Sequence, residues 1–289
     1  MKPLPIILCT SLVVAAFAFA EEKERLLFRD NKKDPRLQIE SDDGFVIPQE
    51  SFEVVGNVIV KQLKDGTTLS CQKATGALVK VNGKNEFDKV RLTGGVNATI
   101  IGKKSSFAAS GSSANYDLQD SLRTLALTSN VVLDFSGTGE VKPSGPNKAP
   151  GLKSSAMTVK STSAKVNFRK TTVNGKDSVE IVSADVDGPI TFNGSETVNA
   201  DGKVKKNKFS AKASHLTYKA GAGEELGEVR LTGNIEIQTE DENGEGPDIT
   251  GARTIILQVN KDFEIKKVKF SSDGVGQIKS EFPNSKGGN

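Results

Sequence analysis

One phrase occurs twice in this chain, and it constrains the fold more than any other feature. The phrase is DKVRLTGGV at 88–96, and it returns as GEVRLTGNI at 227–235. Weaker copies occur at 54–58, 125–131 and 186–190. Repeats at intervals of about 35 to 45 residues are typical of architectures in which each unit buries its apolar face against its neighbours. The unit here has the character of a strand pair rather than of a helix pair.

Apolar and polar residues alternate through and around these copies, from about Ser51 onward. A period of two, with many Val, Ile and Thr residues, predicts half-buried strands of antiparallel sheets. One side of each predicted strand should therefore face a core. The candidates for this inward side are Val90, Leu92, Val96, Ile100, Leu125, Leu127, Val131, Leu133, Val229, Leu231, Ile235 and Ile237.

Turn signals separate the alternating runs, whereas helix signals are nearly absent after residue 20. Asn-Gly and Asp-Gly pairs favour hairpins because both residue types accept the positive φ that tight turns need. Such signals lie at 64–66, 82–84, 174–176, 193–194, 201–202 and 242–244. Many short strands joined in this way predict an all-β protein, either a sandwich, a barrel or a jelly roll of antiparallel strands.

Residues 1–20 have the character of a secretory signal peptide. A basic start at Lys2 leads into an apolar run at 5–19, which ends on Ala-Phe-Ala before a charged stretch. This small-x-small ending predicts cleavage after Ala20. The alternative is an uncleaved membrane anchor, because the apolar run is only slightly shorter than the roughly 17 to 25 residues of a spanning helix.

Breaks in the alternation divide the rest of the chain. Residues 21–49 are polar and charged, which predicts a lead-in or tether rather than core. The stretch 137–155 is too rich in Pro and Gly for a central strand, so it marks a surface loop or a boundary. The offset between the two strong copies favours a boundary between two duplicated β units at 50–136 and 156–279, with a tail at 280–289. The pattern leaves open whether the two units share one continuous sheet.

Charge and cysteine content exclude some partners and some stabilising devices. The chain carries 39 basic and 36 acidic residues, a net charge of +3, with no basic stripe interleaved with aromatic residues. This distribution argues against nucleic acid as a partner. Once the leader is removed only Cys71 remains, so burial and strand pairing must stabilise the fold without an internal disulfide. Cys71 itself is interpreted as a small residue within a strand.

Catalytic and metal chemistry find little support in the sequence. The single histidine, His215, lies in a predicted strand, and no Gly-x-Ser-x-Gly motif is present. One histidine and one mature cysteine cannot supply the usual zinc ligands, so no metal or cofactor is expected. The acidic run at 240–248 lacks the register of an EF-hand and is interpreted as a solvated hairpin loop. The lysines at 203–208 fit a charged strand edge better than a site for anionic lipid headgroups.

The repeated phrases also resemble a known family. Gly-Asn-Val steps alternate with segments at 107–117 and 209–218 that run from Phe through small residues to Tyr. Over about 51–276 this arrangement resembles the OstA-like β-jellyroll domain of the lipopolysaccharide export proteins LptA, LptC and the periplasmic part of LptD. The resemblance implies a twisted, V-shaped pair of antiparallel sheets, with acyl chains held between the sheets. The chain departs from a minimal member in its length and in its Pro- and Gly-rich break.

The resemblance also implies a function. It suggests a periplasmic, non-catalytic protein that binds lipopolysaccharide or another multi-acyl lipid on its way to the outer membrane. Its partners would be other OstA-like proteins, or further copies of itself stacked head to tail, joined through edge strands. The twelve inward candidates would then contact lipid, although ordinary core packing is the simpler interpretation of each. The alternatives are an envelope adaptor that binds partners through its sheet edges and a secreted enzyme.

Overall fold

The described part of the chain consists of β-strands joined by short connections. A computed structural model describes residues 25–29, 33, 37–47, 50–63, 66–81, 84–101, 105–119, 122–141, 151–173, 176–200, 203–222, 225–241, 243, 248–259, 265–271 and 279–281. The strands are β1 (Leu26–Arg29), β2 (Leu37–Ser41), β3 (Asp43–Ile47), β4 (Ser51–Gln62), β5 (Thr67–Val81), β6 (Lys84–Ile101), β7 (Ser105–Gln119), β8 (Leu122–Val141), β9 (Gly151–Val173), β10 (Lys176–Ala200), β11 (Lys203–Lys219), β12 (Gly227–Glu240), β13 (Asp248–Val259), β14 (Ile265–Ser271) and β15 (Lys279–Glu281). The prediction of an all-β antiparallel fold is confirmed. Within these ranges no helix has the length and apolar character that crossing a membrane requires, and the predicted leader at 1–20 lies outside them.

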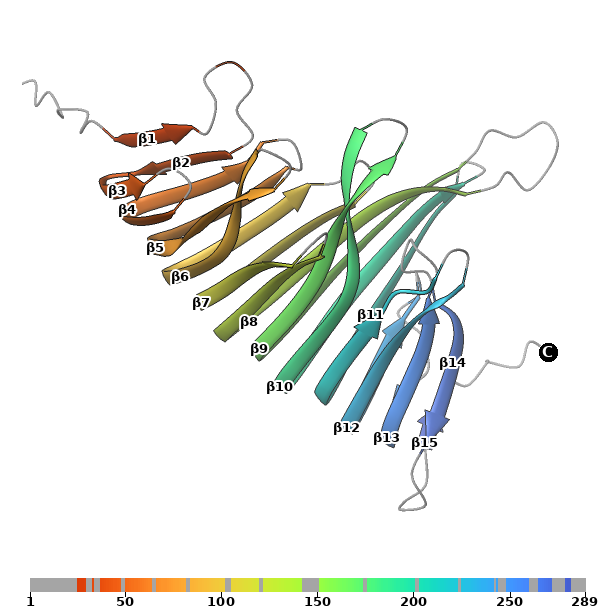
Figure 1. The fold of residues 1–289 in the computed structure, drawn as a ribbon. Coiled ribbons are helices and arrows are strands. Elements are labelled where there is room, and N and C mark those ends of the chain that lie inside the picture. The colour runs from red at the N-terminus through yellow and green to blue at the C-terminus, as the bar shows by residue number, and fades with distance from the viewer. Residues whose placement is uncertain are drawn as a thin grey trace, which may run out of the picture.

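All the strands belong to one antiparallel sheet. Its order is β1-β2-β4-β5-β6-β7-β8-β9-β10-β11-β12-β13-β14, with β3 paired to β4 and β15 paired to β13. From β4 to β14 each strand therefore pairs with the next one along the chain, and Figure 1 shows this meander as an unbroken colour sequence. Five of the six predicted turns lie at junctions between consecutive strands.

The sixth turn prediction, at 193–194, is wrong. Asn193 and Gly194 lie inside β10, where they pair with β9 on one side and with β11 on the other. The glycine serves packing rather than a turn, because a Cβ at Gly194 would lie 1.9 Å from Cζ of Phe209. The Phe209 ring thus occupies the space that a side chain at position 194 would fill.

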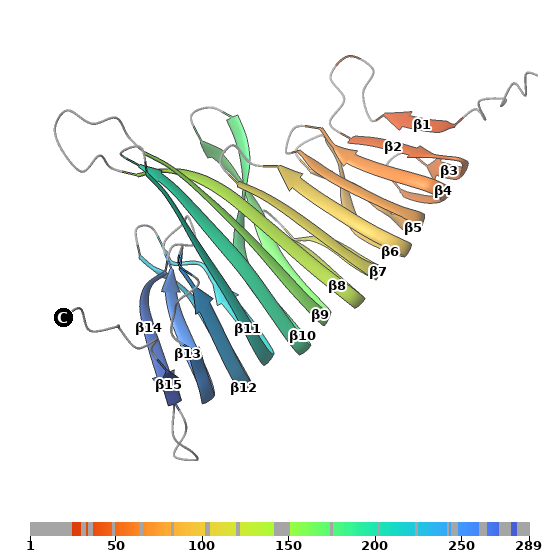
Figure 2. The same ribbon diagram turned by 180° about the vertical axis from the view of Figure 1, so that it is seen from behind.

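The repeated phrase marks a bend in the sheet. On each even-numbered strand from β4 to β12 one extra residue interrupts the register with both neighbours, as between Thr93 and Val96 on β6. Residues with positive φ supply these bulges; they are Gly56, Asn57, Gly94, Gly95, Ser129, Asn130, Gly188 and Gly233. Bulges bend a strand and increase its twist. Because the bulges lie side by side, the sheet folds over along a line of corners, visible as the labelled edge in Figures 1 and 2.

The corners divide the sheet into two arms that face each other. The first arm holds the first halves of the even strands and the second halves of the odd strands, and the second arm holds the rest. Tyr116 in the first arm donates a hydrogen bond to Oε1 of Gln62 in the second arm, at 3.2 Å. The arms are thus the two predicted sheets of a V, joined through every strand, with a single apolar cluster between them.

The extra residue has a consequence for which side chains point inward. On the even strand β6 the inward residues stay in phase through the corner, as Leu92 and Val96 show. On the odd strand β5 no residue is inserted, so the phase changes between the buried Cys71 and the buried Ala74. Every odd strand from β5 to β13 makes the same change. Period-two alternation therefore holds through the even strands and breaks in the odd ones.

On β2 and on each odd-numbered strand from β5 to β13, the last inward residue before the corner is small. These residues are Ser41, Cys71, Gly111, Ser161, Ala213 and Ala252. The two arms meet here, which leaves room only for a short side chain. Sγ of Cys71 lies 3.2 Å from the carbonyl oxygen of Lys73, and the Ser41 and Ser161 hydroxyls bond in the same way two residues ahead. Cys71 is therefore the small strand residue that the sequence predicted, and burial raises the pKa of its thiol to about 11.

The structure bears on two expectations about domain organisation, the tether at 21–49 and the boundary at 137–155. The stretch 21–49, expected as a tether outside the core, contains β1 to β3, and Leu37 and Ile39 are fully buried. Its alternation covers only about one short strand, too little to stand out beside the surrounding charges. Across the Pro- and Gly-rich break, β8 and β9 pair as far as Val141 and Gly151. The sheet is therefore continuous, and the duplication of 50–136 and 156–279 stays a prediction about the sequence.

Candidate functional site

The structure brings all twelve inward candidates into the interior between the arms. Ten of them are buried, and Val229 and Ile237 are partly buried against the same cluster. Their rows follow the strand register; Val90 on β6 pairs with Tyr116 on β7, which pairs with Leu125 on β8. The interior is thus a continuous apolar layer. Contact of these residues with lipid stays a prediction.

The interior is sealed along the N-terminal strands. Ten of the eleven largest fully buried side chains lie in β2 to β9, and the eleventh is Ile190 in β10. The ring centroids of Tyr116 and Phe168 lie 6.3 Å apart, with an angle of 47° between the ring planes. The two rings fill the space between the arms in this region. The strands β1, β2 and β3 extend the sheet at the same end. An acyl chain could enter here only by displacing packed side chains.

The interior is less closely filled along the C-terminal strands. Seven of the twelve partly buried apolar residues that border the core lie here: Ile181, Phe209, Tyr218, Val229, Ile237, Ile249 and Leu257. From β10 onward the inner face therefore keeps apolar surface in contact with solvent.

Two inward rows carry this exposed apolar surface. In the first arm the row runs through Ala184, Tyr218, Val229 and Leu257. In the second arm it runs through Phe192, Ala211, Ile237 and Ile249. Burial, together with the nearby Glu180 carboxylate, raises the pKa of Tyr218 to about 12. The Tyr218 hydroxyl therefore stays protonated at neutral pH and adds no charge to the row.

Polar groups line the interior far from the corners. Arg123, near the free end of the first arm, points inward, is paired with Phe168 in the register, and is only 3% exposed. Near the free end of the second arm, Nζ of Lys153 lies 2.7 Å from the Glu196 carboxylate. Charged groups at this depth are stable only when they have partners. These charged positions therefore border the apolar interior away from the corners.

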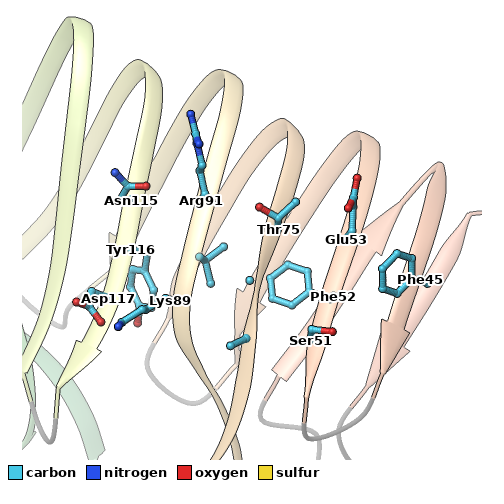
Figure 3. A pocket seen from close by; sticks show the side chains of 13 residues that line it. Phe45, Ser51, Phe52, Glu53, Thr75, Lys89, Arg91, Asn115, Tyr116 and Asp117 are labelled. Atoms are coloured by element: carbon cyan, nitrogen blue, oxygen red, sulfur yellow. The ribbon is translucent and has the colours of Figure 1, made fainter.

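A separate hollow of about 610 Å³ lies on the outer face of the first arm. Figure 3 shows Glu53, Thr75, Arg91 and Asn115 side by side across β4, β5, β6 and β7. Acidic and basic groups are mixed here, and Nζ of Lys73 lies 2.7 Å from Oε1 of Glu53. This mixture of charged groups suits a small polar molecule but favours no single class of ligand.

Most of the partly exposed inward residues are absent from the twelve inward candidates for a physical reason. Those candidates come from the repeated phrases and their echo at 125–131, which lie on even strands, where alternation continues through the corner. Phe209, Tyr218 and Leu257 lie on odd strands, where the inward phase changes at the corner. A pattern that allows one phase change per strand, as from Ala213 to Leu216, would have found them.

His215 lies on the outer face and is half-exposed. Its ring lies beside Asp185 and Asp187 of the neighbouring strand. The proximity of these aspartates to His215 was not predictable, because the register of β10 against β11 cannot be read from the sequence. The Asp-x-Asp spacing on a strand, which places both carboxylates on one face, was the available signal.

Comparisons with known proteins give no match for this chain among family models, curated sequences or solved structures.

Proposed function

We propose that this protein is a periplasmic lipid carrier or bridge of the lipopolysaccharide-export type. In this proposal the acyl chains of lipopolysaccharide, or of another multi-acyl lipid, lie between the two arms. The observation that carries it is the inner face of β10 to β13, which keeps partly exposed apolar side chains in two facing rows. The leader predicted at 1–20 supports the location. The likeness of the repeated phrases to OstA-like domains supports the type of cargo.

The energetics of such binding are favourable on the C-terminal side. Each methylene transferred from water into an apolar site contributes about 0.8 kcal/mol. A chain lying along the rows that hold Tyr218 and Ile237 would cover apolar surface that is now partly exposed. Along β4 to β9 the same chain would first have to separate packed side chains. We therefore propose that lipid binds between β10 and β13 and enters from the β14 side.

An envelope adaptor is the second candidate. The sheet is not closed, and β14 pairs only with β13 among the described strands, so its outer edge can add a partner strand. However, Lys267 and Lys269 are exposed on this strand, and charged edge residues oppose uncontrolled strand addition. The edge therefore suits a selected partner better than an open-ended polymer.

Site-specific photocrosslinking in the intact periplasm tests the proposal. A benzophenone amino acid replaces Ile237, which is partly buried and faces inward, or Gln238, which follows it on β12 and is exposed on the outer face. The expected result is a lipid adduct at position 237 and none at 238. Lipid extraction and native mass spectrometry of the purified protein would then identify the cargo.

A third position separates the carrier from the adaptor. The same photoreactive residue at Val268, exposed on β14, should yield protein adducts if the edge binds a partner. Protein adducts at 268 without lipid adducts at 237 would favour the adaptor. Equal lipid labelling at 237 and 238 would overturn the carrier, because it would show general contact with a membrane rather than an interior site.

A further inference from the structure

Three side chains capable of binding a metal ion converge on the outer face of the sheet. They are Asp185, Asp187 and His215, and one ligand atom of each lies within 4.8 Å of the others. Nδ1 of His215 lies 2.6 Å from Oδ1 of Asp187, and its Nε2 lies 3.4 Å from Oδ1 of Asp185. The imidazole ring is thus held between two carboxylates.

This arrangement leaves one contact unsatisfied when the imidazole is neutral. With the ring proton on Nδ1, that nitrogen donates to Asp187, and the lone pair of Nε2 faces an oxygen of Asp185. Two acceptors at 3.4 Å repel unless a positive species lies near them. A metal ion relieves the repulsion and uses both groups as ligands, while the Asp187 carboxylate fixes the orientation of the ring as outer partners of metal-bound histidines do.

Strand pairing holds the three residues in place. Asp187 is directly opposite His215 in the register of β10 and β11, and Asp185 lies two residues away on the same face. The backbone beside them is also fixed, since Oγ1 of Thr162 donates to the carbonyl oxygen of Asp187 at 2.9 Å. Two ligand atoms about 2.1 Å from an ion can lie up to about 4.2 Å apart, so binding requires only small side-chain rotations.

The surroundings leave the site accessible and set its charge. Asp185 and Asp187 are exposed, and the positions opposite the three residues on neighbouring strands hold Ser163, Lys165, Thr217 and Thr232. Lys165 is the single cation among these four. The next basic residue on β12, Arg230, is bonded to Glu228 at 2.9 Å. Two carboxylates facing one lysine leave a net negative site.

We propose that Nε2 of His215 and the carboxylate of Asp185 bind one divalent transition-metal ion, of the Zn²⁺ or Mn²⁺ kind, on the outer face of β10 and β11, while Asp187 holds the imidazole ring through Nδ1. The imidazole nitrogen favours these ions over Mg²⁺ and Ca²⁺, which prefer oxygen ligands alone. Two protein ligands leave the remaining coordination positions to solvent. The ion would join two strands beside the Gly188 corner, outside the partly open half of the interior. This site does not depend on the proposed lipid function, and either can fail without the other.

Calorimetric titration of the untagged mature chain with ZnCl₂, MnCl₂ and MgCl₂ tests the site. The expected result is saturation at one Zn²⁺ or Mn²⁺ ion per chain, with Mg²⁺ binding at least about tenfold more weakly. His215→Gln and Asp187→Asn should each lower the affinity for Zn²⁺ at least about tenfold. Glu236→Gln is the matched control, because Glu236 forms an exposed outer-face ion pair with Lys212 at 2.8 Å and should leave the affinity unchanged.

A spectroscopic measurement gives an independent answer on the intact protein. His215 is the only histidine, so its imidazole gives one set of NMR signals. Substoichiometric Mn²⁺ should broaden these signals selectively, and Asp185→Asn should remove the effect. The proposal is overturned if neither Zn²⁺ nor Mn²⁺ binds saturably, or if His215→Gln leaves binding unchanged. Without saturable binding of either ion, His215 and Asp187 would be a hydrogen-bonded pair with the Asp185 carboxylate nearby, and not a metal site.

Discussion

The N-terminal half of the folded sheet, β4 to β9, and the C-terminal half, β10 to β13, have the same architecture. They differ in how completely side chains fill the interior between the arms. Strands β4 to β9 and strands β10 to β13 have the same meander, the same corners and the same change of phase on odd strands. The N-terminal half encloses large side chains such as Phe52 and Leu125 completely, whereas the C-terminal half leaves Ile237 and Leu257 partly exposed. The comparison teaches that the bulged corner determines the shape, while side-chain volume decides whether the interior is a core or an opening.

Matched leucine truncations give the largest expected contrast between the halves. Leu125→Ala, at a position with no exposed surface, should lower the free energy of unfolding by about 3 to 4 kcal/mol, because a cavity forms in a closed interior. Leu257→Ala, on the partly open row, should cost about 1 kcal/mol, since part of its surface is already hydrated. Urea denaturation of both variants checks the difference. Equal losses would show that the two halves are equally packed.

Glycine substitutions at two corners should give the next largest contrast. Gly188 has φ of +103°, and a Cβ there would lie 2.1 Å from Oγ1 of Thr162. Gly95 has φ of +76° with no heavy atom within 4 Å of the added Cβ. Gly188→Ala should therefore cost about 3 kcal/mol, and Gly95→Ala only the backbone strain of about 1 kcal/mol. Thermal unfolding measures both, and a second substitution, Thr162→Ala, should recover part of the loss at 188 but none at 95.

These corners also show how far the sequence alone could predict the fold. Alternation around 88–96, 125–133 and 227–235 identified the strands and ten buried side chains correctly, because side-chain direction in a strand follows from the backbone geometry. The Gly-Asn steps were taken only as marks of a repeat, although they are the bulges that fold the sheet. Whether Asn-Gly is a turn or a packing site, as at 193–194, depends on a partner such as Phe209 that only the three-dimensional structure supplies.

The sites were harder to predict than the strands. The partly open rows depend on the phase change of odd strands, which no single strand reveals. The cluster around His215 depends on the register between β10 and β11. Short sequence windows contain neither kind of information, because both arise when strands pair.

Alkaline titration tests the open half through Tyr218. Its pKa lies at about 12 because burial, and then the nearby Glu180 carboxylate, disfavour the phenolate, whereas an unfolded tyrosine titrates near 10. The unfolded state therefore loses its proton first, and the stabilisation present below about pH 10 is lost as the pH rises toward about 12. After allowance for solvent screening, the loss should amount to about 1 to 2 kcal/mol. Tyr218→Phe, compared with the parent chain over this pH range, should lack that component; identical pH profiles would show that the site is as hydrated as the surface.

The smallest expected change in stability concerns the inward residue at the corner, a position that recurs in both halves of the sheet. Cys71 in the N-terminal half and Ala213 in the C-terminal half occupy equivalent inward positions, and Ser161 occupies the same position on β9. Cys71→Ser and Ala213→Cys should each change the free energy of unfolding by less than about 1 kcal/mol, because each places at one corner a side chain that another corner already accommodates. The Cys71 thiol, with its pKa raised to about 11, should also resist alkylation until the protein unfolds. Should Ala213→Cys be tolerated while Cys71→Ser is not, the halves would differ at the corner itself, and the contrast between them could no longer be assigned to the side chains that fill the interior.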